Sequence, residues 1–270
     1  MRIRAGFEIT YDCPAPVPML LTLSVHSERR GDLETPDWLR TDPMLDVRQY
    51  IDGFGNICSR ILAPAGRTVL SADFVIRDSG ALDEYWPNAG QVAVHNLPDD
   101  VLVYLLGSRY CETDRLTDVA WSLFGGTPVG WPRVQAIVDH VHNHIEFGYQ
   151  HARPTKGSFE AHHEALGVCR DYAHLAITFC RCMNIPARYC TGYLGDIGVP
   201  IVGEMDFSAW FEAYLDGRWY AFDPRNHQRR IGRILMARGR DATDVALANT
   251  FGTAILAGFK VVSYDLEDEG

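Results

Sequence analysis

Long apolar runs are missing from this chain of 270 residues. No stretch approaches the roughly 18 to 20 consecutive apolar residues that a membrane-spanning helix needs, so we expect no such helix. Basic residues are also scarce: Lys and Arg total 25 against 35 Asp and Glu, which gives a formal net charge of −10. A nucleic-acid-binding protein usually presents a broad basic surface, so this charge balance argues against that class.

A secretion signal and a disulfide framework are two further absences. Residues 1–6 turn polar too soon for a signal peptide. The seven cysteines are an odd number, and without a secretion signal we interpret them as reduced thiols of a cytoplasmic protein. What is present, 47% apolar and 22% charged residues, is typical of a globular protein with a sizeable core.

The first 110 residues show the alternation of apolar and polar side chains that is typical of half-buried strands. Prolines and the Asp-Gly and Gly-Asn steps at residues 52–56 separate these runs. The sequence therefore predicts an N-terminal antiparallel β domain over residues 1–110. Its strand-like runs are residues 2–11, 19–26, 55–62 and 68–76.

Residues 111–270 begin with helical patterns instead. Apolar residues recur with a 3.6-residue period over 131–145 and again over 167–183, which predicts two amphipathic helices. Asp216-Gly217 between two strand-like runs predicts a two-residue hairpin turn. We therefore expect a second, α+β domain over 111–270. Its other expected elements are strands at 187–193, 206–215 and 218–223, a helix near 241–248 and a closing strand at 259–264.

Cys169 stands at the start of the second expected helix. A thiol in the first helical turn faces free backbone N–H groups and the positive end of the helix dipole, and both favour the thiolate. Its own backbone N–H is a natural oxyanion donor. The sequence therefore predicts a nucleophile here. Most cysteines are small core residues, and that is our interpretation of the others in this region. These are Cys180, Cys182 and Cys190.

The hairpin places position 208 close to Asp223. A two-residue turn at 216–217 makes Leu215 oppose Arg218 and Trp210 oppose Asp223. Side chains alternate along a strand, so position 208 and Asp223 become diagonal neighbours, roughly 7 to 8 Å apart. A histidine at 208 would complete a Cys–His–Asp relay. The residue there is Ser208.

Three segments resemble the motifs of bacterial transglutaminase-like proteins, in order and in spacing. The resemblance implies an α+β, papain-like transglutaminase core, in which a Cys-bearing helix packs on an antiparallel sheet, and a β-rich N-terminal half also fits the family. The segments are Gly-Val-Cys-Arg-Asp-Tyr-Ala-His-Leu (167–175), Ser-Ala-Trp-Phe-Glu-Ala-Tyr (208–214) and Trp-Tyr-Ala-Phe-Asp-Pro (219–224).

The resemblance also implies a chemistry and three site residues. Family members hydrolyse or transfer amide acyl groups through a thioester, so the implied partner is a peptide or protein amide, and no metal or other cofactor is implied. Cys169 takes the position of the nucleophile and Asp223 that of the orienting carboxylate. Ser208 occupies the position where the family usually has histidine.

Ser208 leaves two functions open. A serine hydroxyl is a poor proton acceptor near pH 7, and a positioned base contributes about 10²- to 10⁴-fold to rate. His227, beyond Asp223, is an alternative base if the chain folds back after Pro224, whereas His174 lies on a poor face of the Cys169 helix. The chain is therefore either a cysteine-dependent enzyme acting on amide bonds or a pseudoenzyme that binds a peptide or protein.

Other polar residues give weaker signals. His140 and His144 share a helix face at a spacing that zinc sites use, but the sequence shows no third ligand, so we interpret them as a solvated helix face and expect no metal. Glu212 shares a strand face with Ser208, and we interpret it as a carboxylate on the hairpin surface. Further histidines near this helix are His142, His162 and His163.

Overall fold

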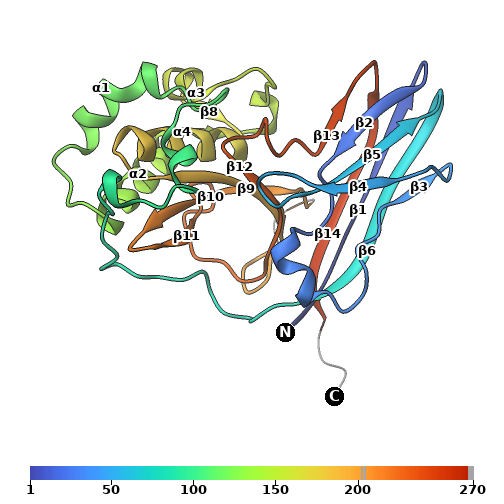
Figure 1. Cartoon of the computed structure of the whole chain (residues 1–270), viewed down its shortest axis with the longest axis horizontal. Helices are drawn as coiled ribbons and strands as arrows, with labels where there is room; N and C mark the ends of the chain where they lie inside the picture. The colour runs from blue at the N-terminus through green and yellow to red at the C-terminus, as the bar shows by residue number, and fades with distance from the viewer. Residues whose placement is uncertain (202, 204, 267–270) are drawn as a thin grey trace.

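Two four-stranded antiparallel sheets form the β unit, which contains the N-terminal strands together with the last two strands of the chain (Figure 1). The computed structural model describes residues 1–201, 203 and 205–266. One sheet has the order β14-β1-β6-β3 and the other β13-β2-β5-β4. The strands are β1 (Arg2–Cys13), β2 (Val17–Leu21), β3 (Arg40–Asp42), β4 (Arg48–Ile51), β5 (Ile57–Ala63), β6 (Gly66–Arg77), β13 (Ala248–Thr250) and β14 (Ile255–Leu266).

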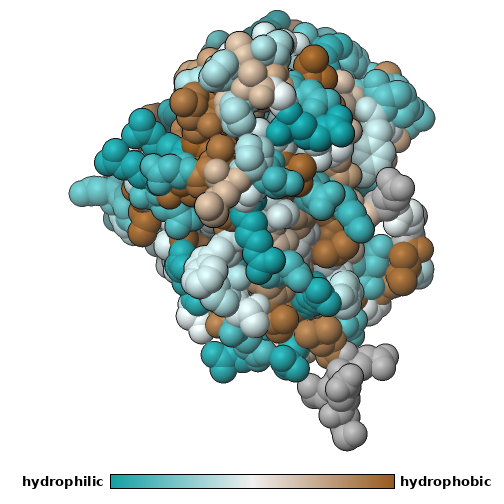
Figure 2. All heavy atoms as spheres, turned by 90° about the vertical axis from the view of Figure 1, so that its right-hand side faces the viewer, coloured by the Kyte–Doolittle hydropathy of each residue, from teal (hydrophilic) through white to brown (hydrophobic). Residues whose placement is uncertain are grey.

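Alternation along these strands creates the core of the β unit. On β1, Ile3, Ala5, Phe7 and Ile9 are buried while the intervening Arg2, Arg4 and Glu8 face outward. A single apolar cluster contains these residues together with Val17, Met19 and Leu21 of β2 in the other sheet. On the outer face that Figure 2 presents, apolar side chains form separate patches among polar ones.

The second half packs helices on one antiparallel sheet of order β11-β10-β9-β12. Helix α4 is the centre of this half, because its residues from Asp171 to Cys182 are all buried and it contacts α1, α2, α3, β9 and β10. The helices are α1 (Thr113–Phe124), α2 (Trp131–His144), α3 (Ser158–Glu164) and α4 (Cys169–Cys182). The strands of the sheet are β9 (Ala187–Leu194), β10 (Ser208–Leu215), β11 (Arg218–Phe222) and β12 (Arg233–Gly239).

Short elements complete the fold. A two-stranded parallel ladder brings the residues that precede α4 beside the end of α2. Its strands are β7 (Glu146–Phe147) and β8 (Leu166–Gly167). The 3-10 turns are η1 (Ser27–Asp32), η2 (Val94–Asn96), η3 (Leu102–Leu105) and η4 (Tyr149–His151). Among the described residues, no helix has the length and apolar character needed to cross a membrane.

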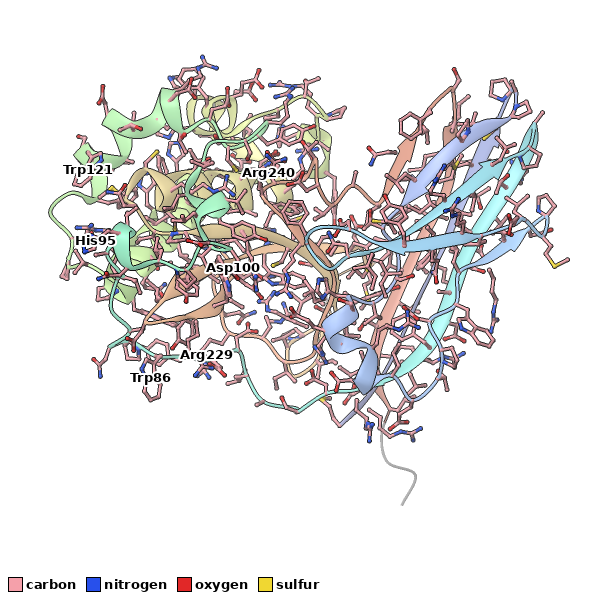
Figure 3. All side chains as sticks on the ribbon, in the orientation of Figure 1. Trp86, His95, Asp100, Trp121, Arg229 and Arg240 are labelled. Carbon is pink, nitrogen blue, oxygen red and sulfur yellow. The ribbon has the colours of Figure 1, made fainter. Side chains whose placement is uncertain are left out.

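The connection between the two halves, residues 78–112, runs along the outside of the second half, where Trp86 and His95 lie (Figure 3). Ion pairs attach it to the sheet. Asp83 pairs with Arg233 of β12 at 2.9 Å, and Glu84 pairs with Arg218 of β11 at 2.6 Å. The first pair is the stronger anchor, because both of its side chains are largely buried, whereas exposed pairs contribute little.

The predicted α+β class with an N-terminal antiparallel β region is confirmed. The hairpin also has the expected register: Leu215 pairs with Arg218, and the ladder ends at the pair of Phe211 with Phe222. The predicted helix at 241–248 is wrong. Asp241 there accepts hydrogen bonds from the backbone N–H groups of Tyr110 and Thr243, at 2.8 Å each, which fixes a turn. Helices α1 and α3 and strand β12 were not among the expected elements.

The C-terminal strands differ from the expected division of the chain at residue 110. β14 pairs with β1 along most of its length, and β13 pairs with β2. The last described residues therefore belong to the N-terminal β unit, although the second half precedes them in sequence. This return brings Leu256 and Phe259 of β14 next to the second half, where they contribute to the site.

Candidate active site

Cys169 is the first residue of α4, and local hydrogen bonds fix this helix start. The Asp171 side chain accepts a hydrogen bond from the Val168 N–H at 2.9 Å, and the Asp171 N–H donates to the Val168 carbonyl at 2.8 Å. These bonds satisfy groups that a helix N-terminus otherwise leaves free. Cys169 is half-buried, whereas the other six cysteines, all in the described part of the chain, are buried.

The Cys169 side chain lines two hollows that share part of their lining. The smaller is a pocket of about 120 Å³, and the larger is a groove of about 480 Å³ between the β unit and the second half. Both are also lined by Ser208, the first residue of β10, and by Asp206, which lies two residues before it. The remaining walls of the smaller pocket are Phe147, Tyr149, Leu194, Asp196, Met205, Phe207, Arg225, Asn226 and Arg230.

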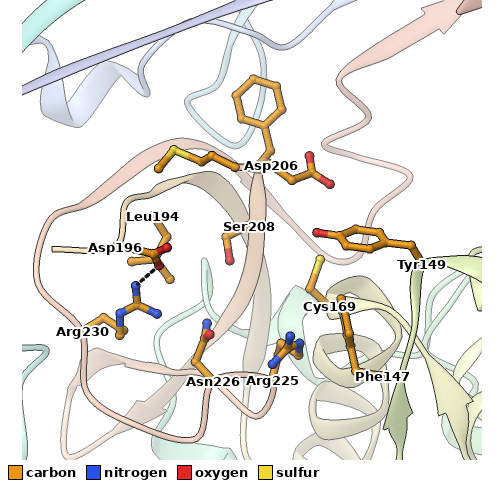
Figure 4. A pocket seen from close by; sticks show the side chains of 12 residues that line it. Phe147, Tyr149, Cys169, Leu194, Asp196, Asp206, Ser208, Arg225, Asn226 and Arg230 are labelled. Atoms are coloured by element: carbon orange, nitrogen blue, oxygen red, sulfur yellow. Dashed lines mark hydrogen bonds and ion pairs between the residues drawn. The ribbon is translucent and has the colours of Figure 1, made fainter. Parts of the chain in front are cut away.

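Figure 4 shows how the polar groups of the pocket are arranged. In this view the hydroxyl of Tyr149 lies next to the Cys169 sulfur and the carboxylate of Asp206 lies beyond that hydroxyl, while Ser208 lies across the pocket. Asp196 is paired with Arg230 at 3.2 Å, so its charge is balanced within the pocket. The structure thus brings Ser208 to the same pocket as Cys169, with Asp206 as an additional carboxylate.

Asp223 is held by groups other than an imidazole. Its side chain is 1% exposed, and its Oδ2 accepts hydrogen bonds from Asn226 Nδ2 at 2.8 Å and from Arg233 Nη2 at 3.0 Å. Its Oδ1 accepts from the backbone N–H groups of Arg225 and Asn226. Asp223 therefore stabilises the turn after β11 and the neighbouring strand β12, and its oxygens are occupied.

Neither alternative histidine reaches the pocket. His227 has a positive φ of 53°, which turns it toward α2. There its Nε2 lies 2.8 Å from Asp139 Oδ1, and its ring stacks on His142 with 4.3 Å between centroids. His174 is fully buried, where its Nε2 accepts a hydrogen bond from the Ala242 N–H at 3.1 Å. Among the described residues, no histidine lines either hollow beside Cys169.

The electrostatics of the thiol differ from the expectation drawn from the helix N-terminus. Burial, with the negative charges of Asp206 and Asp223, raises the pKa of Cys169 to about 11. The N–H groups of Ala209 and Arg170, which hydrogen-bond to the sulfur, act in the opposite direction but are outweighed. Burial also raises the pKa of the Asp206 carboxyl. The free thiol is therefore protonated at neutral pH.

Asp206 is the site residue that sequence reasoning missed. Its signal was its position two residues before Ser208, so that both side chains reach the same end of β10. Glu212, by contrast, forms an ion pair with Arg188 at 2.5 Å and lines neither hollow. Three histidines of the described chain have ring nitrogens close enough together to hold a metal: His140, His144 and His162. None of the three lines the pocket.

Comparisons with known proteins give a family match over part of the chain and a similar fold. Residues 122–224, which include Cys169, Ser208 and Asp223, match the model of the transglutaminase-like superfamily. A candidate cysteine protease from Cytophaga hutchinsonii has a similar structure, with a TM-score of 0.86 and 29% sequence identity, over 100% of this chain and 92% of that chain.

Two curated mycobacterial relatives match a shorter segment. The uncharacterized protein ML0607 of Mycobacterium leprae is 41% identical over 91 residues, which is 32% of each chain. The uncharacterized protein Rv2569c of Mycobacterium tuberculosis is 37% identical over 89 residues, 29% of this chain and 28% of that protein. The match therefore spans about a third of the length of these relatives.

Proposed function

We propose that this chain, a transglutaminase-like superfamily protein, acts on amide bonds of a peptide or protein through a thioester on Cys169. The observation that carries the proposal is the position of Cys169, half-buried at the start of α4 and accessible from the groove between the two halves. The thioester would then pass its acyl group to water or to an amine.

The groove suits an extended polypeptide. It is lined on one side by Tyr11, Leu256 and Phe259 of the β unit and on the other by Tyr110 of the connection and Tyr189 of the second half. Aromatic and apolar walls provide contact area for side chains of many kinds. We therefore propose a peptide or protein substrate, which would lie across the Cys169 sulfur.

Two backbone N–H groups next to the Cys169 sulfur are candidate hydrogen-bond donors for the carbonyl oxygen of such a substrate. The backbone N–H groups of Arg170 and Ala209 hydrogen-bond to it in the free protein. When the sulfur forms a bond to the carbonyl carbon, these two N–H groups become available to the oxyanion that develops next to it. Preorganised donors of this kind typically contribute about 10² to 10³ to the rate each.

Asp206 is the proton acceptor that we propose in place of histidine. The Cys169 proton passes to the Asp206 carboxylate as the sulfur attacks the carbonyl carbon, and the protonated carboxyl returns it to the amine that leaves. Water or an acceptor amine then gives a proton to Asp206 while attacking the thioester, and this proton restores the thiol. The first transfer is uphill, because the thiol pKa of about 11 lies above that of a carboxyl, so we expect slow turnover.

Replacement of Asp206 by asparagine separates the effect of its charge on the Cys169 pKa from its proposed role as proton acceptor. Loss of the negative charge is expected to lower the pKa of Cys169, so alkylation of the thiol at pH 8 becomes faster than in the parent. Acyl transfer is expected to become at least tenfold slower, because the proton acceptor is gone. Both rates are measured on the same preparations by peptide mass and by product release.

Asp196→Asn is the matched control, because it removes a carboxylate from the same pocket, one that is paired with Arg230. It is expected to change the alkylation rate at pH 8 by less than about twofold. An Asp206→Asn variant that alkylates faster and also transfers acyl groups as fast as the parent would contradict the role of Asp206 as base.

A peptide-binding pseudoenzyme is the second candidate function. The observation that favours it is that both oxygens of Asp223 are occupied, by Asn226, Arg233 and backbone N–H groups, with no imidazole among their partners within residues 1–201, 203 and 205–266. The same groove would then hold a peptide without cleaving it.

An acyl-trapping experiment tests the proposed function. The chain is incubated with a peptide p-nitrophenyl ester, and the acyl adduct is measured by intact mass and located by peptide mass. One adduct per chain on Cys169 is expected, because the other six cysteines are buried. Cys169→Ala is expected to form none, and Cys182→Ala as much as the parent. Lack of an adduct in the parent, with the peptide still bound, would select the pseudoenzyme instead.

The trapped adduct also separates hydrolysis from transfer, when its decay is followed with and without an added primary amine. A cytoplasmic location belongs to this proposal as well. The support for it is that all seven cysteines are free thiols, as expected in a reducing compartment.

A further inference from the structure

Three histidines from two helices converge outside the two hollows that Cys169 lines. His140 and His144 lie one turn apart on α2, and His162 comes from α3. One ring nitrogen from each lies within 4.8 Å of the other two. From this convergence we propose that His140, His144 and His162 bind a divalent transition-metal ion, with zinc as the expected ion.

The hydrogen bonding of the three rings leaves nitrogen lone pairs free. His140 Nε2 and His162 Nδ1 are buried, and neither has a hydrogen-bond partner in the part of the chain that the structure describes. Buried polar atoms without partners are uncommon in folded proteins, and a ligand is one reason for them. His144 Nε2 lies 2.6 Å from the His162 carbonyl oxygen and must donate to it, so the lone pair of His144 is on Nδ1. A backbone carbonyl that fixes the tautomer in this way is a common partner of metal-ligating histidines.

The surroundings of the rings favour the neutral form that a metal requires. Phe179 of α4 packs against both His140 and His162, with 5.9 Å between ring centroids in each case. Burial and the neighbouring imidazoles lower the pKa of His162 to about 4, and burial also lowers the pKa of His140. These two imidazoles are therefore unprotonated at neutral pH and need no proton release to bind a metal.

The geometry fits zinc after a small movement. Ligand nitrogens at 2.0 to 2.1 Å from a tetrahedral zinc lie roughly 3.3 to 3.4 Å apart, so the three nitrogens need to approach by up to about 1.5 Å. The rings of His140 and His144, and those of His144 and His162, are stacked at 5.2 and 4.8 Å, and rotation about their side-chain torsions can bring the nitrogens together. Three imidazoles suit zinc, copper or nickel and are poor ligands for magnesium or calcium.

The bound ion would join α2 to α3. Both helices pack on α4, which begins with Cys169. His162 could not be recognised as a third ligand from the sequence, because it lies 18 residues beyond His144 and the chain between α2 and α3 decides where it points. The site is therefore a structural clamp on the helical layer, and it is independent of the proposed chemistry at Cys169.

The test uses the whole chain without an affinity tag, stripped with a chelator and with Cys169 alkylated in every sample so that its thiol cannot bind metal. Zinc binding is measured by calorimetry and by metal analysis after gel filtration. One zinc per chain with a Kd in the micromolar range or below is expected, with an increase in Tm of at least about 2 °C at saturating zinc and no increase with magnesium. His162→Gln is expected to bind zinc at least tenfold more weakly.

His95→Gln is the matched control. It also removes one imidazole, but from the exposed turn η2 on the outside of the second half (Figure 3), and it is expected to bind zinc as the parent does. If His162→Gln fails to fold, the visible spectrum of Co²⁺ bound to the parent decides, because tetrahedral nitrogen ligation gives intense bands that hydrated Co²⁺ lacks. No stoichiometric zinc in the parent, equal binding by His162→Gln, or a hydrated-type cobalt spectrum would overturn the proposal.

Discussion

Replacement of Ser208 by histidine is expected to increase the rate of acyl transfer about 10²-fold over the parent, at the lower end of what a positioned base contributes. Ser208 lines the same pocket as Cys169, so an imidazole there starts from the backbone position that faces the nucleophile. Imidazole has a pKa near 6.5, so it accepts a proton at neutral pH and can protonate a leaving amine. The measurement is the rate of acyl-enzyme formation and decay with the p-nitrophenyl ester of a peptide.

We expect the lower end of the range for a positioned base because Asp223 is already hydrogen-bonded to other groups. Its oxygens are engaged by Asn226 and Arg233, so a new histidine gains no orienting carboxylate unless one of these partners moves. The acyl-transfer rate of the histidine variant should fall as the pH drops below about 6.5, because the imidazole becomes protonated and can no longer accept the thiol proton. Ser208→Gln supplies a side chain of similar reach without a base and is expected to stay at the parent rate. A histidine variant no faster than the parent would refute the inherited position of a base at 208.

Local patterns were sufficient to predict the helix that carries the nucleophile and the hairpin beside it. The apolar period before Asn184 marks α4, whose residues from Asp171 to Cys182 are buried, and Asp216-Gly217 sets the register because a two-residue turn allows only one pairing. Both depend on residues close together in sequence. The hairpin therefore predicts position 208 beside Asp223, whereas its relation to Cys169 is implied by the resemblance to the family.

The partners of Asp223 could not be predicted in this way. Arg233 reaches the carboxylate from β12, which joins the sheet next to β9 rather than next to the hairpin. Two further contacts could not be predicted for the same reason: β14 returns to pair with β1, and His162 joins the α2 histidines. In each case two segments meet through tertiary packing, and neither segment carries a local signal for the other. The raised pKa of Cys169 has the same origin, because Asp206 and burial act through space.

The pH dependence of Cys169 alkylation should show an inflection near pH 11, about two and a half pH units above that of an ordinary thiol. At pH 8 only about one thiol in 10³ would then be ionised, against about one in four for a thiol with a pKa of 8.5. Since the thiolate is the reacting form, alkylation by a haloacetamide at pH 8 is expected to be roughly 200-fold slower than that of a cysteine peptide. The adduct is located by peptide mass at each pH.

The same chain unfolded in denaturant is the control, because it retains the sequence around Cys169 but loses the burial and the carboxylates. Its inflection should return to about 8.5. The sign of the effect can be checked with Asp206→Asn, which should move the inflection of the folded chain downward, since the Asp206 charge opposes ionisation of the thiol. An inflection below about 8 in the folded parent would mean that the helix N-terminus and the N–H groups of Ala209 and Arg170 outweigh burial. Cys169 would then attack as a thiolate that exists before substrate binds, and neither Asp206 nor a histidine would be needed to take its proton.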